Sequence, residues 1–397
     1  MSVMDAERRF ADSPDLDGGD YLPRARALRE LIEAEAAATE KGGTLSPAVV
    51  EAMRDAGLFW MSLPKELGGG GDSLVEAMKV VEEIAYADGS SGWSLMANQG
   101  TIVAAAVYLG DEGAGEIFGG GKLPILAGML GPAGKSTVDG DGYRASGKFA
   151  FGSGMAHADW IGAGMLVMDD GKPRMLQSGP EVRVCFIPKD RIEVLGNWNP
   201  PGLVGTGSYD YAVPEQLVPA GFSFERTTLA PMRGGPRFTL GLAVIGASGH
   251  AAVALGLMKR ALVEIVRIAS GKKRPGYSGP VSENDVFKHQ FMLREAAYQS
   301  ARDYTYRAFQ DAEECAAAGQ ELTAEQRARI RQATTWVHQV ADDVVRFCHL
   351  WSGSEVIKQG TALGRVSRDM AIATQHVVVD PITLVDGAPA VMQAWLA

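Results

Sequence analysis

The sequence predicts an α+β protein in which helical segments flank a central β domain. Between residues 23 and 120, apolar side chains recur three and four positions apart, as they do on amphipathic helices. Between 123 and 218, glycines separate short runs that alternate apolar and polar residues, which is typical of the strands of a small barrel or sandwich. From residue 239 onward the helical pattern returns, with long amphipathic runs over 284–318 and 323–352.

These patterns divide the 397 residues into five segments. The segments are a flexible N-terminus (1–22), an N-terminal helical domain (23–122), a central β domain (123–220), a linker (221–238) and a C-terminal helical bundle domain (239–397). Residues 239–258 are nearly all apolar, and by length alone they could span a membrane. Because this stretch contains Ser248, His250 and several glycines, we interpret it as a buried central helix.

The composition narrows the class of function. The net charge of −10 argues against nucleic acid and against an anionic membrane surface as partners. The three cysteines form no CxxC pair, and no His/Cys cluster has the spacing of a metal site. We therefore expect a globular, metal-free protein with free thiols in the reducing cytoplasm.

A helix is predicted over residues 365–380, and it carries Arg368, Asp369 and His376. Asp369 and His376 are seven positions apart, which places them on nearly the same helix face. An imidazole titrates near neutrality, so His376 can serve as a base, although a single histidine on an apolar face is more often a core residue. Asp369 has a structural alternative, as the partner of Arg368 or Arg365. The histidines interpreted as structural are His250, His289, His338 and His349.

Three motifs carry a resemblance to a known family. Leu63–Gly69 contains a Pro-x-x-x-Gly-Gly loop, Ala87–Trp93 opens the next predicted helix, and Arg368 is followed by Asp369 near the C-terminus. Together with the order of helices, strands and helices, these motifs resemble the acyl-CoA dehydrogenase superfamily from about residue 25 onward. The resemblance implies an N-terminal helical domain, a central β-barrel or sandwich and a C-terminal four-helix bundle.

Further motifs are similar to one branch of that superfamily, the flavin-dependent monooxygenases. The segments are Gly147–Trp160, with Ser153 between two glycines, Gly202–Ser208, and a histidine seven residues after Asp369. The resemblance implies the oxygenase component of a two-component system, which uses reduced FAD or FMN from a separate flavin reductase and hydroxylates an aromatic or related apolar substrate. It also implies a homo-oligomer, either a dimer or a tetramer.

The resemblance assigns candidate site residues by position. His376 is the candidate base or acid, and the hydroxyl of Ser153 suits the flavin N5, because Gly152 and Gly154 leave room for a planar ring. The cofactor-binding candidates are Phe151, Ser153, Gly353, Arg368 and Asp369. The substrate-binding candidates are Asn98, Thr101, Thr206 and Ser208. A glycine-rich turn such as Gly152–Gly154 or Gly205–Ser208 also has a plain structural interpretation, as a bend between strands.

Two departures from the family keep alternatives open. The monooxygenase branch commonly has a second histidine within the segment that corresponds to residues 94–102, and none is present here. Acyl-CoA dehydrogenases often have a catalytic glutamate near the position of His376, and no glutamate follows Glu355. The alternatives are an acyl-CoA dehydrogenase and a non-enzymatic flavin-binding or partner-binding member. A dehydrogenase would need a carboxylate to remove an α-proton. The glutamates considered for that role are Glu295, Glu313 and Glu314.

Overall fold

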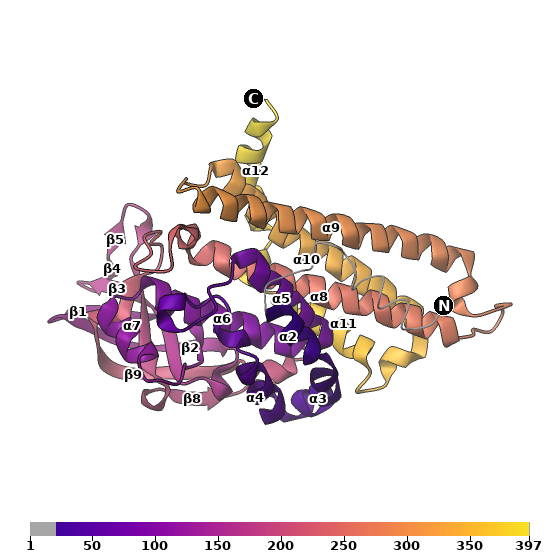
Figure 1. The fold of residues 1–397 in the computed structure, drawn as a ribbon, viewed down its shortest axis with the longest axis horizontal. Helices are drawn as coiled ribbons and strands as arrows, with labels where there is room; N and C mark the ends of the chain where they lie inside the picture. Colours follow the sequence, from indigo (N-terminus) through magenta and orange to yellow (C-terminus); the bar gives the residue numbers. More distant parts are fainter. Residues whose placement is uncertain (1–20, 397) are drawn as a thin grey trace.

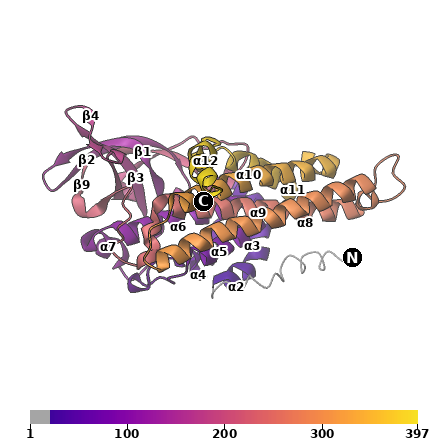
Figure 2. The ribbon, with the colours of Figure 1, turned by 90° about the horizontal axis from the view of Figure 1, so that it is seen from above.

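The computed structural model describes residues 21–396, and it confirms the predicted order of helices, strands and helices (Figure 1). The sheet lies at one end of the molecule and the long C-terminal helices extend away from it, as both views show (Figures 1 and 2). Of the segment predicted to be flexible, residues 1–20 lie outside the described residues. Helix α2 begins at Tyr21, so the last two positions of that segment are helical, and Leu22 is buried.

The N-terminal domain is helical. Its elements are α2 (Tyr21–Ala27), α3 (Arg29–Gly42), α4 (Pro47–Asp55), η2 (Leu58–Trp60), η3 (Lys65–Leu67), α5 (Leu74–Ala87), α6 (Gly89–Tyr108) and α7 (Asp111–Phe118). Ser46 caps α4, because its hydroxyl accepts a hydrogen bond from the Val49 N–H at 3.3 Å. The carboxylate of Asp88 caps α6 through the Ser91 N–H at 2.8 Å, and Asp88 is the only residue between α5 and α6. The two helices that line the site described below are therefore joined by a single buried turn.

The central domain is built on one mixed sheet. Its strands are β1 (Leu126–Asp139), β2 (Gly142–Gly152), β3 (Trp160–Asp169), β4 (Lys172–Pro173), β7 (Val182–Pro188), β8 (Glu193–Gly196), β9 (Tyr209–Pro219) and β10 (Ser223–Glu225). The order across the sheet is β10-β7-β3-β1-β2-β9-β8, with β4 paired to β3; β1 and β3 run parallel, and the other pairs are antiparallel. A separate hairpin joins β5 (Met175–Leu176) and β6 (Gly179–Pro180), and short turns lie at η4 (Met155–His157), η5 (Lys189–Arg191), η6 (Val204–Thr206) and η7 (Ala220–Phe222). Strand β10 falls inside the predicted linker, so part of that linker belongs to the edge of the sheet.

Three long helices dominate the C-terminal domain. Its elements are η8 (Pro236–Leu240), α8 (Gly241–Gly271), η9 (Val281–Glu283), α9 (Asp285–Ala317), α10 (Ala324–Ser352), η10 (Gly353–Ile357), α11 (Ala362–Ala373), η11 (Val377–Val379) and α12 (Ile382–Ala394). Within residues 21–396, two stretches are long and apolar enough to span a membrane, Pro236–Gly271 and Val377–Ala394. The most apolar window of the first is 72% buried inside the protein, as a core helix would be, whereas that of the second is only 17% buried. The interpretation of residues 239–258 as a buried central helix agrees with this burial.

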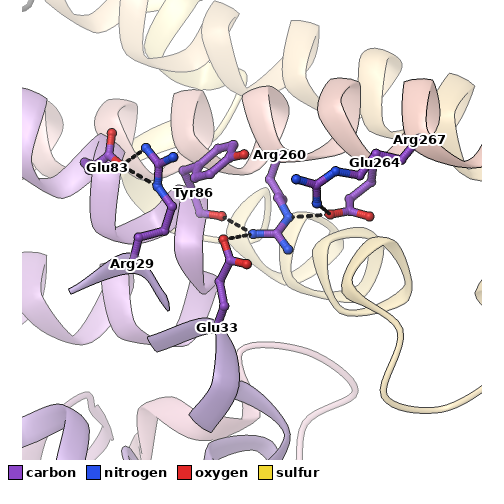
Figure 3. A network of polar contacts seen from close by, with 7 residues as sticks. All are labelled: Arg29, Glu33, Glu83, Tyr86, Arg260, Glu264 and Arg267. Carbon is purple, nitrogen blue, oxygen red and sulfur yellow. Dashed lines mark hydrogen bonds and ion pairs between the residues drawn. The ribbon is translucent and has the colours of Figure 1, made fainter. Parts of the chain in front are cut away.

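A polar network fixes the N-terminal helices against α8 (Figure 3). The guanidinium of Arg260 on α8 donates to Glu33 at 2.6 Å and to Glu264 at 2.8 Å. It also reaches the carbonyl of Tyr86, at the end of α5, at 3.3 Å. Because Arg260 is only 6% exposed, these contacts are needed to offset the cost of burying its charge. The network therefore positions α5 on the helix that forms the opposite wall of the site.

Candidate active site

A cavity of about 600 Å³ lies between the sheet and the helical domains. Its walls come from α5, α6, β1, the end of β2, the segment 198–208, α8 and the residues that follow α11. This volume lies in the range of small-molecule sites. The predicted site residues that line it are Phe151, Ser153, Thr101, Thr206, Ser208 and His376. The predicted site residues outside its lining are Asn98, Gly353, Arg368 and Asp369.

Ser153 lies where the strand β2 ends in a tight bend. Phe151 has φ of 65° and Gly154 has φ of 72°, so the chain turns sharply on both sides of the serine. A positive φ is strained for a residue with a side chain, and such strain persists only where the surroundings hold it. Phe151 is 60% exposed at the edge of the cavity, edge-on to Trp198 with ring centroids 6.4 Å apart. The bend therefore presents both an aromatic ring and a hydroxyl to one space.

A chain of hydroxyl groups leads away from Ser153. Trp93 Nε1 donates to Ser153 Oγ at 3.2 Å, and Ser153 Oγ lies 2.7 Å from Ser208 Oγ. Ser208 Oγ lies 2.7 Å from Thr206 Oγ1, which donates to the Leu203 carbonyl at 2.8 Å. An indole N–H can only donate and a carbonyl can only accept, so the direction of every bond between them is fixed. Ser153 therefore donates to Ser208 and keeps one acceptor lone pair unused.

Asp369 supports the end of this chain and lies outside the cavity. Its carboxylate accepts the N–H of Leu203 at 2.6 Å, and Leu203 has a positive φ of 51°. The neighbouring Arg368 forms an ion pair with Glu40 on α3. Neither residue lines the cavity, so the assignment of both to cofactor binding stays a prediction. Asp369 acts on the site by holding the loop that contains Leu203.

Two buried carboxylates approach each other behind the loop. Asp369 and Asp88 line the same small pocket of about 10 Å³, roughly the space of one water molecule. Burial, and after it the negative charge of Asp88, raise the pKa of Asp369 to about 7 against the opposing hydrogen bond from Leu203. Burial also raises the pKa of Asp88. The pair is therefore partly protonated near neutral pH.

His376 lies in the cavity, but the predicted helix over 365–380 is wrong at its C-terminal end. Helix α11 ends at Ala373, and His376 caps the short turn η11 instead. Its Nδ1 accepts the Val378 N–H at 3.2 Å, so a neutral ring carries its proton on Nε2. Burial lowers the pKa of His376 to about 4, which keeps the imidazole neutral at pH 7.

His250, interpreted from the sequence as structural, faces His376. The two ring centroids are 4.0 Å apart, and the Trp93 ring lies edge-on to both, at 4.9 Å from His250 and 5.9 Å from His376. His250 is 5% exposed, lines the cavity and has a buried Nδ1 with no hydrogen-bond partner in residues 21–396. Burial lowers its pKa well below the ordinary value, and His376 and His338 lower it further. Its position in an otherwise apolar helix was the only sequence signal, and that signal does not distinguish a core histidine from a site residue.

The remaining predicted residues have other contacts. Asn98 is fully buried, donates to the Leu126 carbonyl at 2.8 Å and pairs with His157 at 3.0 Å. Thr101 lines the cavity but donates back to the Ala97 carbonyl at 2.9 Å. Gly353 lies at the end of α10 beside Lys272, away from the cavity lining. Among residues 21–396 no group of three or more His, Cys, Asp or Glu could hold a metal ion.

The cavity has two chemically different ends. We call Trp93, Ser153, Ser208, His250 and His376 the near end, and Asp72, Arg226, Arg237 and Glu313 the far end; all nine line the cavity. The side chain of Gln99 donates to the hydroxyl of Ser62 at 2.8 Å. The N–H of Asp72 donates to the carbonyl of Met61, the residue before Ser62, at 2.8 Å. Asp72, and with it the far end, therefore lies beside Gln99. Gln99 is six helical positions beyond Trp93, or about 9 Å along α6.

The fold and the cavity define a class of protein: a helical domain, a central sheet and a helical bundle enclose a pocket with a hydroxyl at one wall and an imidazole at another. Comparison with protein families makes this specific. The family described as "Acyl-CoA dehydrogenase, N-terminal domain" matches residues 24–114, and "Acyl-CoA dehydrogenase, C-terminal domain" matches residues 248–381. Together they span more than half of the chain, which belongs to the acyl-CoA dehydrogenase superfamily.

Similar proteins within that superfamily are monooxygenases. The chain is 26% identical over 339 residues to an indole-3-acetate monooxygenase of Pseudomonas putida, covering 85% of each protein. It is also 26% identical to the flavin-dependent monooxygenase, oxygenase subunit HsaA, of Rhodococcus jostii, covering 91% of this chain and 94% of that protein. A solved structure of XiaF from a Streptomyces species in complex with FADH2 matches with a TM-score of 0.86 at 20% identity, covering 95% of this chain and 94% of the other. The last likeness establishes the fold.

Proposed function

We propose that this protein is the oxygenase component of a two-component flavin-dependent monooxygenase that hydroxylates an aromatic substrate. In this reaction one oxygen atom of O2 enters the substrate and the other leaves as water, while reduced flavin supplies two electrons and becomes oxidised. The likeness to two monooxygenases over most of the chain supports the reaction class. The bound FADH2 of the XiaF structure supports FAD as the cofactor, with FMN as the alternative.

One observation carries the proposal: Ser153 and His376 meet in one cavity, with Trp93 in contact with both. The residues fit a flavin at the near end, because the bend around Ser153 leaves a hydroxyl lone pair unused. A reduced flavin carries a hydrogen on N5, whereas an oxidised flavin has only a lone pair there. Because Ser153 donates to Ser208, its oxygen is set to accept a hydrogen bond, which matches the reduced form. Reduced flavin, when bound, would supply the two electrons that activate O2. The residues of the protein bind and orient the flavin and the substrate and exclude water.

The histidine pair supplies proton transfer at the near end. A neutral imidazole with its proton on Nε2 can donate a hydrogen bond at pH 7, and its exchange of a proton with a substrate group contributes typically 10²- to 10⁴-fold in rate. His250 lies beside it from α8 and provides a second imidazole. We therefore assign to His250 the place that the missing histidine of residues 94–102 has in related sequences.

The acyl-CoA dehydrogenase alternative lacks a suitable carboxylate. Of the three glutamates considered, only Glu313 lines the cavity, at the far end. Its oxygens accept the N–H groups of Leu74 at 2.8 Å and Val75 at 3.4 Å, at the start of α5. Glu295 and Glu314 are hydrogen-bonded to glutamines on the surface of α9. No described carboxylate at the near end is therefore available to remove an α-proton.

The partners follow from the same proposal. A separate flavin reductase supplies the reduced flavin, and the protein acts in the cytoplasm as a homo-oligomer, a dimer or a tetramer. Gly353 suits contact with the phosphate of a flavin that is bound in a neighbouring subunit, because the cations of Lys272 and Arg274 border this glycine turn. The apolar side chains of α12 and of Trp395 just after it support subunit contact, since Val385, Met392 and Trp395 are 65%, 67% and 82% exposed.

The test is product formation with isotopic oxygen. Reduced FAD or FMN is added to the protein with ¹⁸O2 and a panel of indoles and phenols, and the products are analysed by mass spectrometry. We expect one ¹⁸O atom in a hydroxylated product. A parallel assay with acyl-CoA thioesters and an artificial electron acceptor tests the dehydrogenase alternative. Flavin reoxidation without any hydroxylated product, together with desaturation of an acyl-CoA, would reverse the assignment.

A further inference from the structure

The far end of the cavity contains two arginines that the proposed oxygen chemistry does not use. Arg226 follows β10, and its N–H donates to the Val182 carbonyl at 2.9 Å. Arg237 lies in η8, and its Nη1 donates to the Gly71 carbonyl at 2.6 Å. Both side chains line the cavity. Two cations from separate turns of the predicted linker therefore face the space that reaches His376.

Aromatic contacts bring these two arginines to the same end. The ring of Phe224, two residues before Arg226, lies 5.3 Å from the ring of Tyr108. The hydroxyl of Tyr108 donates to the carbonyl of Phe238, the residue after Arg237, at 2.6 Å. Tyr108 thus ties together the two backbone segments that carry the arginines. Their positions are fixed by buried contacts and not by a loose surface loop.

The charge at the far end is incompletely compensated. Neither arginine forms an ion pair of 4.0 Å or less within residues 21–396, and the Nε of each is buried without a hydrogen-bond partner there. Glu313 lines the same end, but both of its oxygens are used by the start of α5. Burial lowers the pKa of Arg237 in spite of the opposing charges of Glu313 and Asp72. Both guanidinium groups are half-buried, and a partly buried cation whose Nε has no partner is stabilised by an added anion.

The chemistry of the cavity selects the kind of anion. Between the two ends, Met78, Val81 and Met96 present apolar side chains that suit an aromatic ring. Guanidinium groups bind carboxylates with paired hydrogen bonds, and the buried N–H groups of both arginines remain to be satisfied. A ligand with a ring toward His376 and a carboxylate toward Arg226 satisfies both regions at once.

We propose that the far end binds the carboxylate of an aromatic acid substrate, with Arg226 as the principal partner and Arg237 beside it. The proposal rests on the proposed function for the chemistry at the near end, and it adds the substrate class. It assigns to Arg226 a role in specificity: the arginine holds the acid group while the ring lies at the imidazole.

The test compares matched acids and amides on the flavin-free protein. Indole-3-acetate, phenylacetate and benzoate are titrated against their uncharged amides, with binding followed by tryptophan fluorescence and by thermal shift. We expect at least one acid to bind tenfold or more tightly than its amide. In Arg226→Gln that preference falls to about one, and in Arg226→Lys part of it remains because the charge is kept. The matched control is Arg191→Gln, which makes the same charge change on the surface and keeps the preference.

Other outcomes overturn the proposal or separate it from the proposed function. Two results would show that the far end does not bind a carboxylate. One is an acid preference that survives in Arg226→Gln, and the other is a wild-type protein that prefers none of the three acids to its amide. Weaker binding of FMN but not of riboflavin to Arg226→Gln would assign the arginine to the cofactor phosphate instead. If the wild-type protein shows no acid preference while ¹⁸O enters an uncharged indole, the monooxygenase assignment stands and the carboxylate subsite fails. A thermal midpoint within a few degrees of wild type shows that each variant is folded.

Discussion

The two ends of the cavity differ in how their polar groups are satisfied. At the near end, every hydroxyl from Ser153 to Thr206 has a partner, and both imidazoles are neutral at pH 7. At the far end, Arg226 and Arg237 are permanently charged and have buried donors without partners. The near end is thus neutral, and its free acceptors are one lone pair of Ser153 and the Nδ1 of His250, whereas the far end carries cationic donors without partners. The difference separates chemistry from substrate recognition within one space.

The largest effect is expected from His376→Gln. This change removes the titrating ring of the near end but keeps a hydrogen-bonding side chain. We expect hydroxylated product to fall roughly 100-fold or more, because a positioned acid or base contributes about 10²- to 10⁴-fold. Consumption of reduced flavin should continue without product. The control is His289→Gln on the surface of α9, which should leave product formation unchanged. Equal loss of product in both variants would remove His376 from the reaction.

Acid should destabilise the near end and leave the far end charged as before. Burial is the main cause that lowers the pKa of both His338 and His376 to about 4. A histidine with a depressed pKa in the folded protein favours folding above its unfolded pKa near 6.5, and this contribution is lost as pH falls toward 4. A shift of this size is worth about 3 kcal/mol at pH 4 for one fully buried group. Urea unfolding at pH 7.0, 5.5 and 4.5 measures the loss.

His338→Gln provides the comparison for this prediction. The glutamine does not titrate, so the free energy of unfolding should fall less steeply between pH 6.5 and 4 than in the wild type. His349→Gln, at an exposed position, should keep the wild-type slope. Identical slopes in all three proteins would mean that buried histidines do not control the acid sensitivity.

Asp369→Asn should remove a pH dependence of stability that is opposite in sign to that of the buried histidines. The pKa of Asp369 is raised to about 7, so its contribution to stability is present at low pH and is lost as pH rises through 7. An asparagine still accepts the Leu203 N–H and carries no charge beside Asp88. We expect the variant to be more stable than wild type at pH 8, by about 2 kcal/mol or more, and this advantage should shrink as the pH falls toward 4. Asp369→Ala loses the Leu203 bond and should be less stable at both pH values; thermal unfolding measures all three proteins.

The smallest effect is expected from Ser208→Ala, which tests the hydrogen bonds of the hydroxyl chain. Ser208→Ala leaves Ser153 without an acceptor and Thr206 without a donor, which should lower the free energy of unfolding by about 1–3 kcal/mol. The matched control is Ser136→Ala, because Ser136 is 2% exposed and its buried hydroxyl has no partner in residues 21–396. Its replacement should cost little or nothing. Equal destabilisation by the two changes would indicate that packing, and not the hydrogen bonds, matters at Ser208.

The sequence could predict the near end only in part. Ser153 and His376 were identified through motif resemblance, and both line the cavity. No sequence pattern places His250 beside His376, because the two lie 126 positions apart and meet only where α8 packs on η11. The predicted helix over 365–380 failed after Ala373, because the side chain of His376 caps a new turn in place of continuing the helix. Helical periodicity cannot reveal such a cap.

By itself, the sequence determined the order of helices, strands and helices, because periodicity and glycine spacing are local properties of the chain. It also indicated a bend at Ser153, since the flanking glycines permit one, but not the positive φ of Phe151 that the structure shows there. Only the tertiary structure decided which charges lack partners. Arg226 and Arg237 lie in a stretch that reads as a linker, and their shared position depends on Tyr108, more than 100 residues earlier in the chain. Burial is a property of the packed fold, so the sequence alone cannot show which cation is left without a counter-charge.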